Sequence, residues 1–344
     1  MLTRLLHAQA KMPVGKKVLL FAVAWLILIT WLHYLVSDDH EKRRVVTLGY
    51  MPVITNLAAP LLDYVSKNNG AIYFKALKFS SFAEMAESLR NKQIDVAFII
   101  APLSIVLRQQ GEDIKVVYIG NRHESTLVAR SDLHVKNLDD LRGKTIAVPM
   151  RYSGHNLSIL ELLEKKRLQG EIKVVEMNPP DMAAALSVGS LDAYYVGEPF
   201  AAQTLISGEA TKLFYVEDVW RGFICNLVIV RNEMIKNKPE IIATLVRGAA
   251  RSGMWAKKHP QQAARIASLY WNQPQDLVNY VLTTPQNRIV YDRFVPDIHE
   301  LQYMADLMQK YGLLEKNDIT GLVDDRFAKM SDLQNISSLD TILQ

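Results

Sequence analysis

The sequence predicts a bilobal α/β fold, with two lobes built on parallel sheets, preceded by one membrane-spanning helix. Three features predict it: an apolar run near the start, two consecutive sets of alternating strand-like and helix-like segments, and an extended apolar segment after each set. Strands that alternate with helices of about ten residues form βαβ units and hence parallel sheets. The length of 344 residues accommodates such a body behind a membrane segment.

The apolar run covers residues 18–36, VLLFAVAWLILITWLHYLV, in which His33 is the only strongly polar side chain. At about 1.5 Å per residue, a helix of this length crosses the hydrocarbon core of a bilayer. Lysines precede the run and mixed charges follow it, so the positive-inside rule places residues 1–17 in the cytoplasm. Residues 37–44 are expected to form a linker to an exported body.

A cleaved signal peptide is the alternative interpretation of this segment. Its apolar region would be shorter, and the run ends in Leu35, Val36, Ser37 and Asp38, which make a poor cleavage site. We therefore expect an uncleaved, single-pass anchor in the cell membrane. The body then lies in the periplasm or extracytoplasmic space.

The first lobe is expected to comprise residues 45–130 together with 226–344. Ser81 followed by Glu84 is a capping box for one of its helices, which ends at Asn91. The expected strands of the first set are residues 45–50, 72–79, 95–101 and 114–119, and its other helices are 57–68 and 103–110. The carboxy-terminal part is expected to be helical over residues 239–258, 260–270, 275–281 and 297–311.

The second lobe is expected to comprise residues 131–225. Its strands are residues 145–149, 172–177 and 193–196, and its helical segments are 138–141, 154–168 and 179–186. Residues 127–130 and 227–231 are expected to be two crossover strands between the lobes, which is the arrangement that a hinge needs. A ligand that touches both lobes would favour a closed state.

Composition and motifs exclude several classes of function. The net charge of +4 is spread along the chain without a basic block, which argues against nucleic acid as a partner. Cys225 is the only cysteine, so a disulfide framework, a CxxC metal site and a lipid-modified cysteine are excluded. The chain has no Gly-rich phosphate loop, HExxH or GxSxG motif. We expect no catalytic residue, no cofactor and no metal ligand.

Ligands of open α/β sheets bind beyond the carboxyl ends of the strands. The most informative loop there is the one that contains Ser153, Gly154, His155 and Asn156. The glycine allows close backbone approach, the following helix presents unpaired amides, and the serine and histidine add side-chain donors, so the turn suits a small oxyanion. The alternative is that Ser153 only caps the helix and His155 is only a first-turn residue.

Other residues near this edge of the sheets have more than one possible role. Glu198 can bond a ligand hydroxyl, coordinate a cation or bridge to a neighbouring amide. His123 and Glu124 are expected to be solvated loop residues. Five aromatic residues near these loops can stack on a flat ring or belong to the core: Tyr50, Tyr152, Tyr194, Tyr195 and Phe200.

Three stretches carry a resemblance to a known family: GKTIAVPMRYSGHNLSILELL, PPDMAAALSVGSLDAYYVGEPF and DVAFIIAPLSIVLRQQG. They resemble the nitrate/sulfonate/taurine/bicarbonate (NMT1/THI5-like) family of ABC-transporter solute-binding proteins, over about residues 46–329. The likeness is greatest to the nitrate- and bicarbonate-binding branch. It implies a periplasmic-binding-protein-like fold of type II, with the ligand between the lobes.

The resemblance also implies roles for individual residues. His155, with the Ser153–Gly154 turn, resembles the anion-contacting position. If the ligand is anionic and His155 is partly protonated, the affinity should fall as pH rises through the histidine range. The other implied ligand-binding positions are Tyr50, Thr55, Asn56, Pro102, Ser104, Asn156 and Glu198.

The expected function is therefore capture of a small anion by hinge closure and delivery to an ABC permease. Two alternatives keep the binding module: a neutral heterocyclic vitamin precursor as ligand, or ligand sensing for a membrane partner. Pyrimidine synthases of thiamine biosynthesis resemble the same family, but they carry a cysteine-rich iron motif, which a chain with one cysteine lacks.

Overall fold

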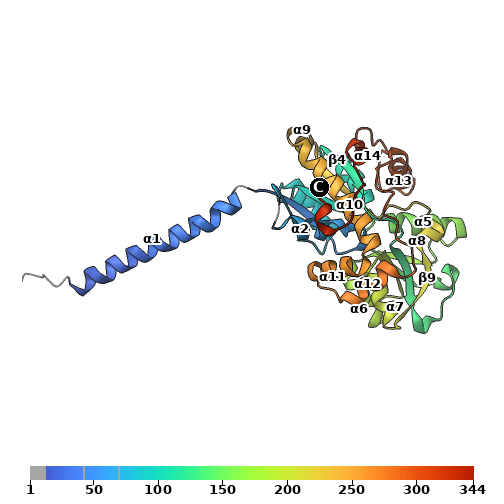
Figure 1. The fold of residues 1–344 in the computed structure, drawn as a ribbon. Helices are drawn as coiled ribbons and strands as arrows, with labels where there is room; N and C mark the ends of the chain where they lie inside the picture. The colour runs from blue at the N-terminus through green and yellow to red at the C-terminus, as the bar shows by residue number, and fades with distance from the viewer. Residues whose placement is uncertain (1–12, 42, 69) are drawn as a thin grey trace, which may run out of the picture. The chain divides into compact units, whose positions relative to one another are not determined.

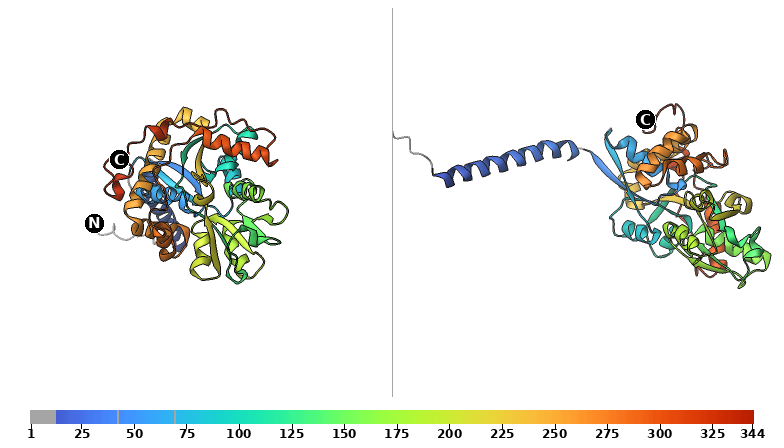
Figure 2. Two further views of the ribbon diagram at one scale, coloured as in Figure 1. Left: turned by 90° about the vertical axis from the view of Figure 1, so that its right-hand side faces the viewer. Right: turned by 90° about the horizontal axis from the view of Figure 1, so that it is seen from below.

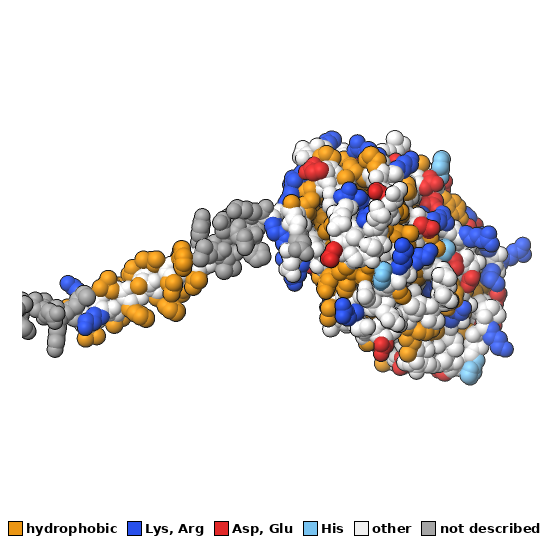
Figure 3. Space-filling view, viewed as in Figure 1, with side chains coloured by type: hydrophobic (Ala, Val, Ile, Leu, Met, Phe, Trp, Pro, Cys, Tyr) orange, Lys and Arg blue, Asp and Glu red, His pale blue; other side chains and the backbone are white. Residues whose placement is uncertain are grey.

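The computed structural model describes residues 13–41, 43–68 and 70–344, and the chain divides into two compact units, Met1–Arg44 and Val45–Gln344. The described part of the first unit forms the helix α1 (Val14–Glu41). Its stretch Val14–Leu32 is long and apolar enough to cross a membrane, and none of that stretch is buried. Figure 3 shows the apolar side chains along it and the basic side chains at its beginning.

The helix α1 continues further than predicted. The linker expected at residues 37–44 is helical as far as Glu41, because the stretch contains neither glycine nor proline to end a helix. Of the expected cytoplasmic segment, residues 1–17, the first twelve residues lie outside the described part of the chain.

The first lobe is built on a five-stranded sheet of order β2-β1-β3-β10-β4. β1 pairs in parallel with β3, whereas β10 runs antiparallel to both β3 and β4. The sheet is therefore mixed, not parallel as predicted, because the strand that returns from the second lobe enters it in the opposite direction. Its strands are β1 (Arg44–Tyr50), β2 (Ile72–Lys78), β3 (Val96–Ile100), β4 (Ile114–Ile119) and β10 (Asn226–Arg231).

The second lobe has a mixed five-stranded sheet of the same kind, in the order β7-β6-β8-β5-β9. β6 pairs in parallel with β7 and β8, and β5 runs antiparallel to β8 and β9. Its strands are β5 (Ser125–Arg130), β6 (Thr145–Val148), β7 (Lys173–Glu176), β8 (Ala193–Gly197) and β9 (Ala210–Tyr215).

The two expected crossover strands are in fact interior strands of the two sheets. Residues 127–130 belong to β5 in the second sheet, and residues 227–231 belong to β10 in the first. The chain crosses between lobes just before each of them, at residues 120–124 and 220–225. The lobe boundary expected after Arg130 was therefore wrong by one strand, because β5 finds its antiparallel partners in the second sheet.

Helices cover both sheets, and several begin at the signals that the sequence provides. Ser81 caps α3 through the amide of Glu84, and prolines open α4, α6, α10 and α11. The first lobe carries α2 (Ala58–Ser66), α3 (Phe82–Arg90), α4 (Ala101–Gln109), α9 (Asn232–Asn237), α10 (Pro239–Lys258), α11 (Pro260–Trp271), α12 (Gln275–Thr283), α13 (Ile298–Lys310) and α14 (Arg326–Lys329). The second carries α5 (Gly154–Lys166), α6 (Pro179–Ser187), α7 (Phe200–Ile206) and α8 (Val216–Val219).

Figures 1 and 2 show this division, with α9, α10 and β4 in the first lobe and α5, α8 and β9 in the second. The apolar cores meet across the boundary. Val53 of the first lobe belongs to the same apolar cluster as Met182 and Tyr194 of the second, and Leu157 of α5 belongs to the cluster that contains Met304 of α13. The lobes are therefore in contact, and side chains of the loops between them are enclosed.

Candidate functional site

All ten residues that the sequence nominates as ligand-binding are buried: Tyr50, Thr55, Asn56, Pro102, Ser104, Ser153, Gly154, His155, Asn156 and Glu198. Most of them lie at the ends of strands or in the first turns of helices, including the end of β1 and the starts of α4 and α5. They differ, however, in whether their polar atoms are engaged within the protein, and this difference separates packing residues from candidate ligand contacts.

In the first lobe, the polar side-chain atoms of Tyr50, Asn56 and Ser104 are hydrogen-bonded to other residues of the protein. The Tyr50 hydroxyl donates to the carbonyl of Tyr270 at 3.3 Å, and Ser104 Oγ donates to Ala101 O at 2.6 Å. Asn56 donates to Met51 O at 3.0 Å and accepts from Asn226 Nδ2 at 3.0 Å. Pro102 occupies the first turn of α4. These contacts fix the loops beside the second crossing, where Ala101 N also donates to Cys225 O.

Thr55 is different. Its side chain is 1% exposed, and its Oγ1 has no hydrogen-bond partner among the described residues beyond a weak interaction with the Cys225 thiol. The loop that carries it also contacts the second lobe, because the neighbouring Ile54 N donates to Glu198 O at 2.9 Å. The Thr55 hydroxyl is therefore a buried polar group next to an interlobe contact.

The start of α5 is shaped by a cap and a close approach. Ser153 Oγ accepts from Asn156 N at 3.1 Å, and the Asn156 side chain donates to Arg151 O at 2.9 Å. A Cβ at Gly154 would lie 2.7 Å from Cε2 of Phe223, so only glycine fits there. Ser153 thus acts as a helix cap, and its role toward a ligand stays a prediction.

His155 lies in the interior behind this cap. Its ring packs edge-on against Tyr195 and Phe223, and its Nε2 is 2.9 Å from Ser125 Oγ. Its Nδ1 is buried and has no hydrogen-bond partner among the described residues. Burial lowers the pKa of His155 to about 3, so the ring is neutral near pH 7. The condition for the expected pH dependence of anion affinity, a partly protonated His155, is therefore not met by the buried ring.

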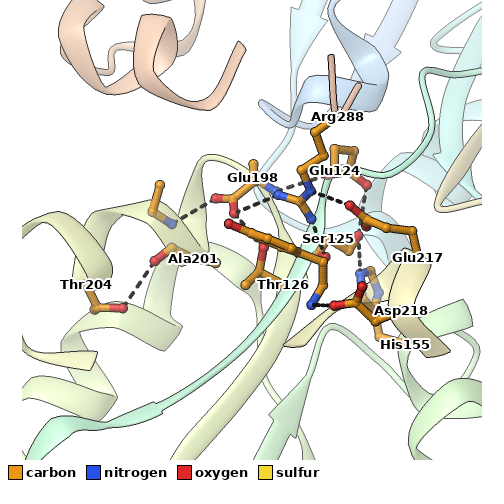
Figure 4. A network of polar contacts seen from close by, with 12 residues as sticks. Glu124, Ser125, Thr126, His155, Glu198, Ala201, Thr204, Glu217, Asp218 and Arg288 are labelled. Atoms are coloured by element: carbon orange, nitrogen blue, oxygen red, sulfur yellow. Dashed lines mark hydrogen bonds and ion pairs between the residues drawn. The ribbon is translucent and has the colours of Figure 1, made fainter. Parts of the chain in front are cut away.

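Glu198 joins a buried ion network between the lobes (Figure 4). Its Oε1 accepts from Thr126 Oγ1 at 2.7 Å and lies 3.7 Å from Nη1 of Arg288, and its Oε2 accepts from Ala202 N at 2.8 Å. Arg288 comes from the segment between α12 and α13 and also bonds Glu217 Oε1 at 2.9 Å. The structure thus gives Glu198 protein partners, which was one of the alternatives for this residue.

Glu124 was expected to be solvated and is fully buried. Its Oε1 accepts from Ser125 Oγ at 2.9 Å and its Oε2 from Glu198 N at 3.0 Å. Burial raises the pKa of Glu124 to about 7, against the opposing influences of the Ser125 hydrogen bond and Arg288. The expectation failed because residues 120–124 cross between the lobes and are covered from both sides.

The aromatic residues considered for stacking on a ring mostly belong to the core. Tyr50, Tyr194, Tyr195 and Phe200 are buried, and the Tyr194 hydroxyl donates to Phe200 O at 3.0 Å. Only Tyr152 of the five is partly exposed. Stacking on a flat ring thus has little support from these residues.

The arrangement provides hydrogen bonding and buried charge. No group of three or more His, Cys, Asp and Glu side chains that could hold a metal ion occurs in the part of the chain that the structure describes. Sequence reasoning missed Ser125, Thr126, Glu217 and Arg288, which complete the network. Arg288 is remote in sequence from its partners, so only the fold brings it to them.

The comparisons with known proteins agree with this architecture. The model of the NMT1-like family matches residues 39–270. A protein of Bacillus subtilis (strain 168) named for binding aliphatic sulfonates is 25% identical over 316 residues, which cover 85% of this chain and 90% of its own length.

Two solved structures share the fold. The alkanesulfonate-binding protein SsuA from Xanthomonas axonopodis pv. citri, bound to MOPS, has a TM-score of 0.71 and 18% identity, covering 82% of this chain and 99% of its own. The periplasmic nitrate-binding protein NrtA from Synechocystis PCC 6803 has a TM-score of 0.73 and 13% identity, covering 84% and 88%. The predicted two-lobed, periplasmic-binding-protein-like fold is confirmed.

Proposed function

Because this chain belongs to the NMT1-like family, we propose that it is the substrate-binding protein of an ABC-type import system and that it captures a small oxyanion or sulfonate. The relatives described above are named for sulfonates and nitrate, which supports this class of ligand. The lobes hold the ligand by closing on it, and no covalent chemistry takes part.

The observation that carries the proposal is a pair of buried polar atoms, one in each lobe, that have no strong hydrogen-bond partner among the described residues. Thr55 Oγ1 belongs to the first lobe and His155 Nδ1 to the second. An unpaired buried polar atom costs roughly 1–3 kcal/mol, so a protein keeps such atoms where something else engages them. A small ligand between the lobes would satisfy both and would favour the closed state.

The helix α1 bears on where this binding protein is located in the cell. Its apolar stretch is suited to a membrane, so the proposal includes a single-pass tether with the body on the extracytoplasmic side. A tether raises the effective concentration of the binding protein near its permease without any new contact. The permease would then receive the ligand from a receptor that does not diffuse away.

A thermal-shift panel tests the proposed function. The full chain in detergent micelles is heated with nitrate, bicarbonate, ethanesulfonate or taurine, and with a flat neutral heterocycle as the contrasting class. A ligand that binds only the folded state stabilises it by RT ln(1 + [L]/Kd), or about 2.7 kcal/mol at a hundredfold excess over Kd. We expect a dose-dependent rise in Tm with at least one anion. A rise with the heterocycle and with none of the anions would contradict the proposal.

A further inference from the structure

Three side chains form a hydrogen-bonded chain that ends at a buried ring nitrogen without a partner among the described residues. Glu124 Oε1 is 2.9 Å from Ser125 Oγ, and Ser125 Oγ is 2.9 Å from His155 Nε2 (Figure 4). All three residues are at most 1% exposed, and the far end of the chain, His155 Nδ1, has no partner among the described residues. A ligand atom that contacts His155 Nδ1 is therefore affected by the direction of the hydrogen bonds between His155, Ser125 and Glu124.

When Glu124 is ionised, the hydrogen bonds between His155, Ser125 and Glu124 can run in one direction only. A carboxylate only accepts hydrogen bonds, so the Ser125 hydroxyl donates its one hydrogen to Glu124. Ser125 Oγ can then only accept from His155, which places the imidazole proton on Nε2. A neutral imidazole has one N–H, so Nδ1 is left as a bare acceptor. An acceptor at that position repels an oxyanion.

When Glu124 is protonated, the polarity reverses. Its Oε2 accepts from the amide of Glu198 at 3.0 Å, so the proton resides on Oε1, which faces Ser125. Oε1 then donates to Ser125, Ser125 donates to His155 Nε2, and the imidazole proton must sit on Nδ1. The same ring now presents a donor to the ligand position. The two states differ by one proton: a proton is taken up at His155 Nδ1, the Nε2 proton passes to Ser125 Oγ, and the Ser125 proton passes to Glu124 Oε1, so no heavy atom has to move.

We propose that Glu124 determines the ligand specificity of the site, because its protonation, relayed through Ser125, sets whether His155 Nδ1 accepts or donates a hydrogen bond. This inference rests on the proposed function and assigns the oxyanion or sulfonate to the form in which Glu124 is neutral. The protein thus binds its anion together with one proton, and His155 itself stays uncharged throughout.

The groups around Glu124 make this protonation accessible near neutral pH. Burial raises the pKa of Glu124 to about 7, and the neighbouring Glu198 carboxylate acts in the same direction. Arg288, the Ser125 hydroxyl and the Cys225 thiol oppose them. His155 has two aromatic rings packed against it, Tyr195 and Phe223, and burial keeps its pKa at about 3. The raised pKa of Glu124 thus brings its protonation into the neutral pH range, whereas burial keeps His155 uncharged there.

The first experiment observes the imidazole directly and needs no ligand. The full chain in detergent micelles is labelled with 15N-histidine, and the His155 signals are identified among the eight histidines by their loss in His155→Ala. We expect the Nε2–H tautomer above about pH 8 and the Nδ1–H tautomer below about pH 6. Glu124→Gln places an amide donor opposite Ser125, so it should hold the Nδ1–H tautomer at both pH values. The same tautomer in the wild type at both pH values would overturn the proposal.

The second experiment measures affinity for nitrate and ethanesulfonate, whose own charge is constant over this range. We expect the wild-type affinity to fall by up to about tenfold per pH unit above the Glu124 titration. Glu124→Gln should bind equally at both pH values, and Glu171→Gln, which removes an exposed carboxylate of the same lobe, should behave as the wild type. If Glu124→Gln does not fold, Ser125→Ala cuts the relay and should make the tautomer and the affinity insensitive to pH.

The two experiments separate the relay from the proposed function. A protein that changes tautomer with pH but binds neither anion would contradict the anion assignment and with it this proposal. A protein that binds an anion with the same affinity at both pH values would overturn the role of Glu124 and leave the proposed function standing.

Discussion

Individual residues between the lobes have titration properties that follow from burial. Glu124 and His155 are both enclosed, and enclosure favours the neutral form of each, so the pKa of Glu124 rises to about 7 and the pKa of His155 falls to about 3. The two shifts have opposite consequences for stability. Folding favours the protonated form of Glu124 and the deprotonated form of His155.

The Glu124 shift predicts a pH dependence of unfolding. Between about pH 4.5 and pH 7 the folded state binds more protons at Glu124 than the unfolded state, so this residue's contribution to the free energy of unfolding falls as pH rises. The loss amounts to at most about 3 kcal/mol, whereas the His155 contribution increases as pH rises toward about 6.5. The measurement is urea unfolding of wild type and Glu124→Gln at several pH values. A difference between the two that does not vary with pH would contradict the assignment.

Arg288 is the cation that two carboxylates share. It lies 3.7 Å from Glu198 and 2.9 Å from Glu217, and its guanidinium also stacks 3.8 Å above the Tyr215 ring. Arg288→Met should lower the free energy of unfolding by about 3–5 kcal/mol, because it leaves buried carboxylates without their partner. Arg326→Met, which breaks an exposed ion pair with Asp324, is the control and should cost less than about 1 kcal/mol. Equal losses in urea unfolding would show that the Arg288 network is not structural.

At the scale of elements, the start of α5 depends on a residue without a side chain. A Cβ at position 154 would lie 2.7 Å and 2.9 Å from ring carbons of Phe223 and 3.3 Å from Ile224 O. Gly154→Ala should therefore lower the free energy of unfolding by about 1–3 kcal/mol through overpacking, and it should displace the ring beside His155. Thermal unfolding and the His155 ring signals measure both effects, and an unperturbed variant would count against the close packing.

The helix α1 predicts how the chain fractionates. The intact chain should remain in membranes after an alkaline wash, and a variant that lacks residues 1–42 should be recovered in the soluble fraction. The mass of the membrane-bound chain separates an anchor from a signal peptide, because an anchor retains residues 18–36. A membrane-bound chain that begins after residue 36 would contradict the tether.

Elements with strong local signals could be predicted from the sequence. The helix α10 (Pro239–Lys258) has the predicted bounds because a proline opens it and another proline opens the next helix. The strand β9 (Ala210–Tyr215) was not predicted, since it lies at the edge of its sheet with β5 as its partner and is half exposed. An edge strand lacks the apolar run that marks an interior strand.

The candidate site could be predicted only in part, for the same physical reason. The local signal of the glycine turn located His155, but the rings that enclose it come from Tyr195 and Phe223, which are distant in sequence. Glu124 was interpreted as solvated because its neighbours are polar. Its burial and the influence of Arg288 on it depend on how the lobes meet, which no local pattern encodes.

At the scale of the whole body, the lobes are held by contacts that a closed binding protein needs. The helix α13 of the first lobe reaches α5 of the second through Tyr303 to Glu161 at 3.0 Å and Tyr311 to Glu164 at 2.7 Å. These contacts and the Arg288 network join the two lobes, so they would have to break when the lobes separate. A ligand shifts the balance between open and closed states only by its differential affinity for them.

The most direct measurement is a calorimetric titration of the wild type and His155→Ala with the anion that gives the largest thermal shift. We expect saturable binding to the wild type and an affinity lower by about tenfold, or ~1.4 kcal/mol, in a His155→Ala variant that still unfolds cooperatively. Equal affinity in the two proteins would place the ligand elsewhere, and the absence of binding to both would contradict the substrate-binding function itself.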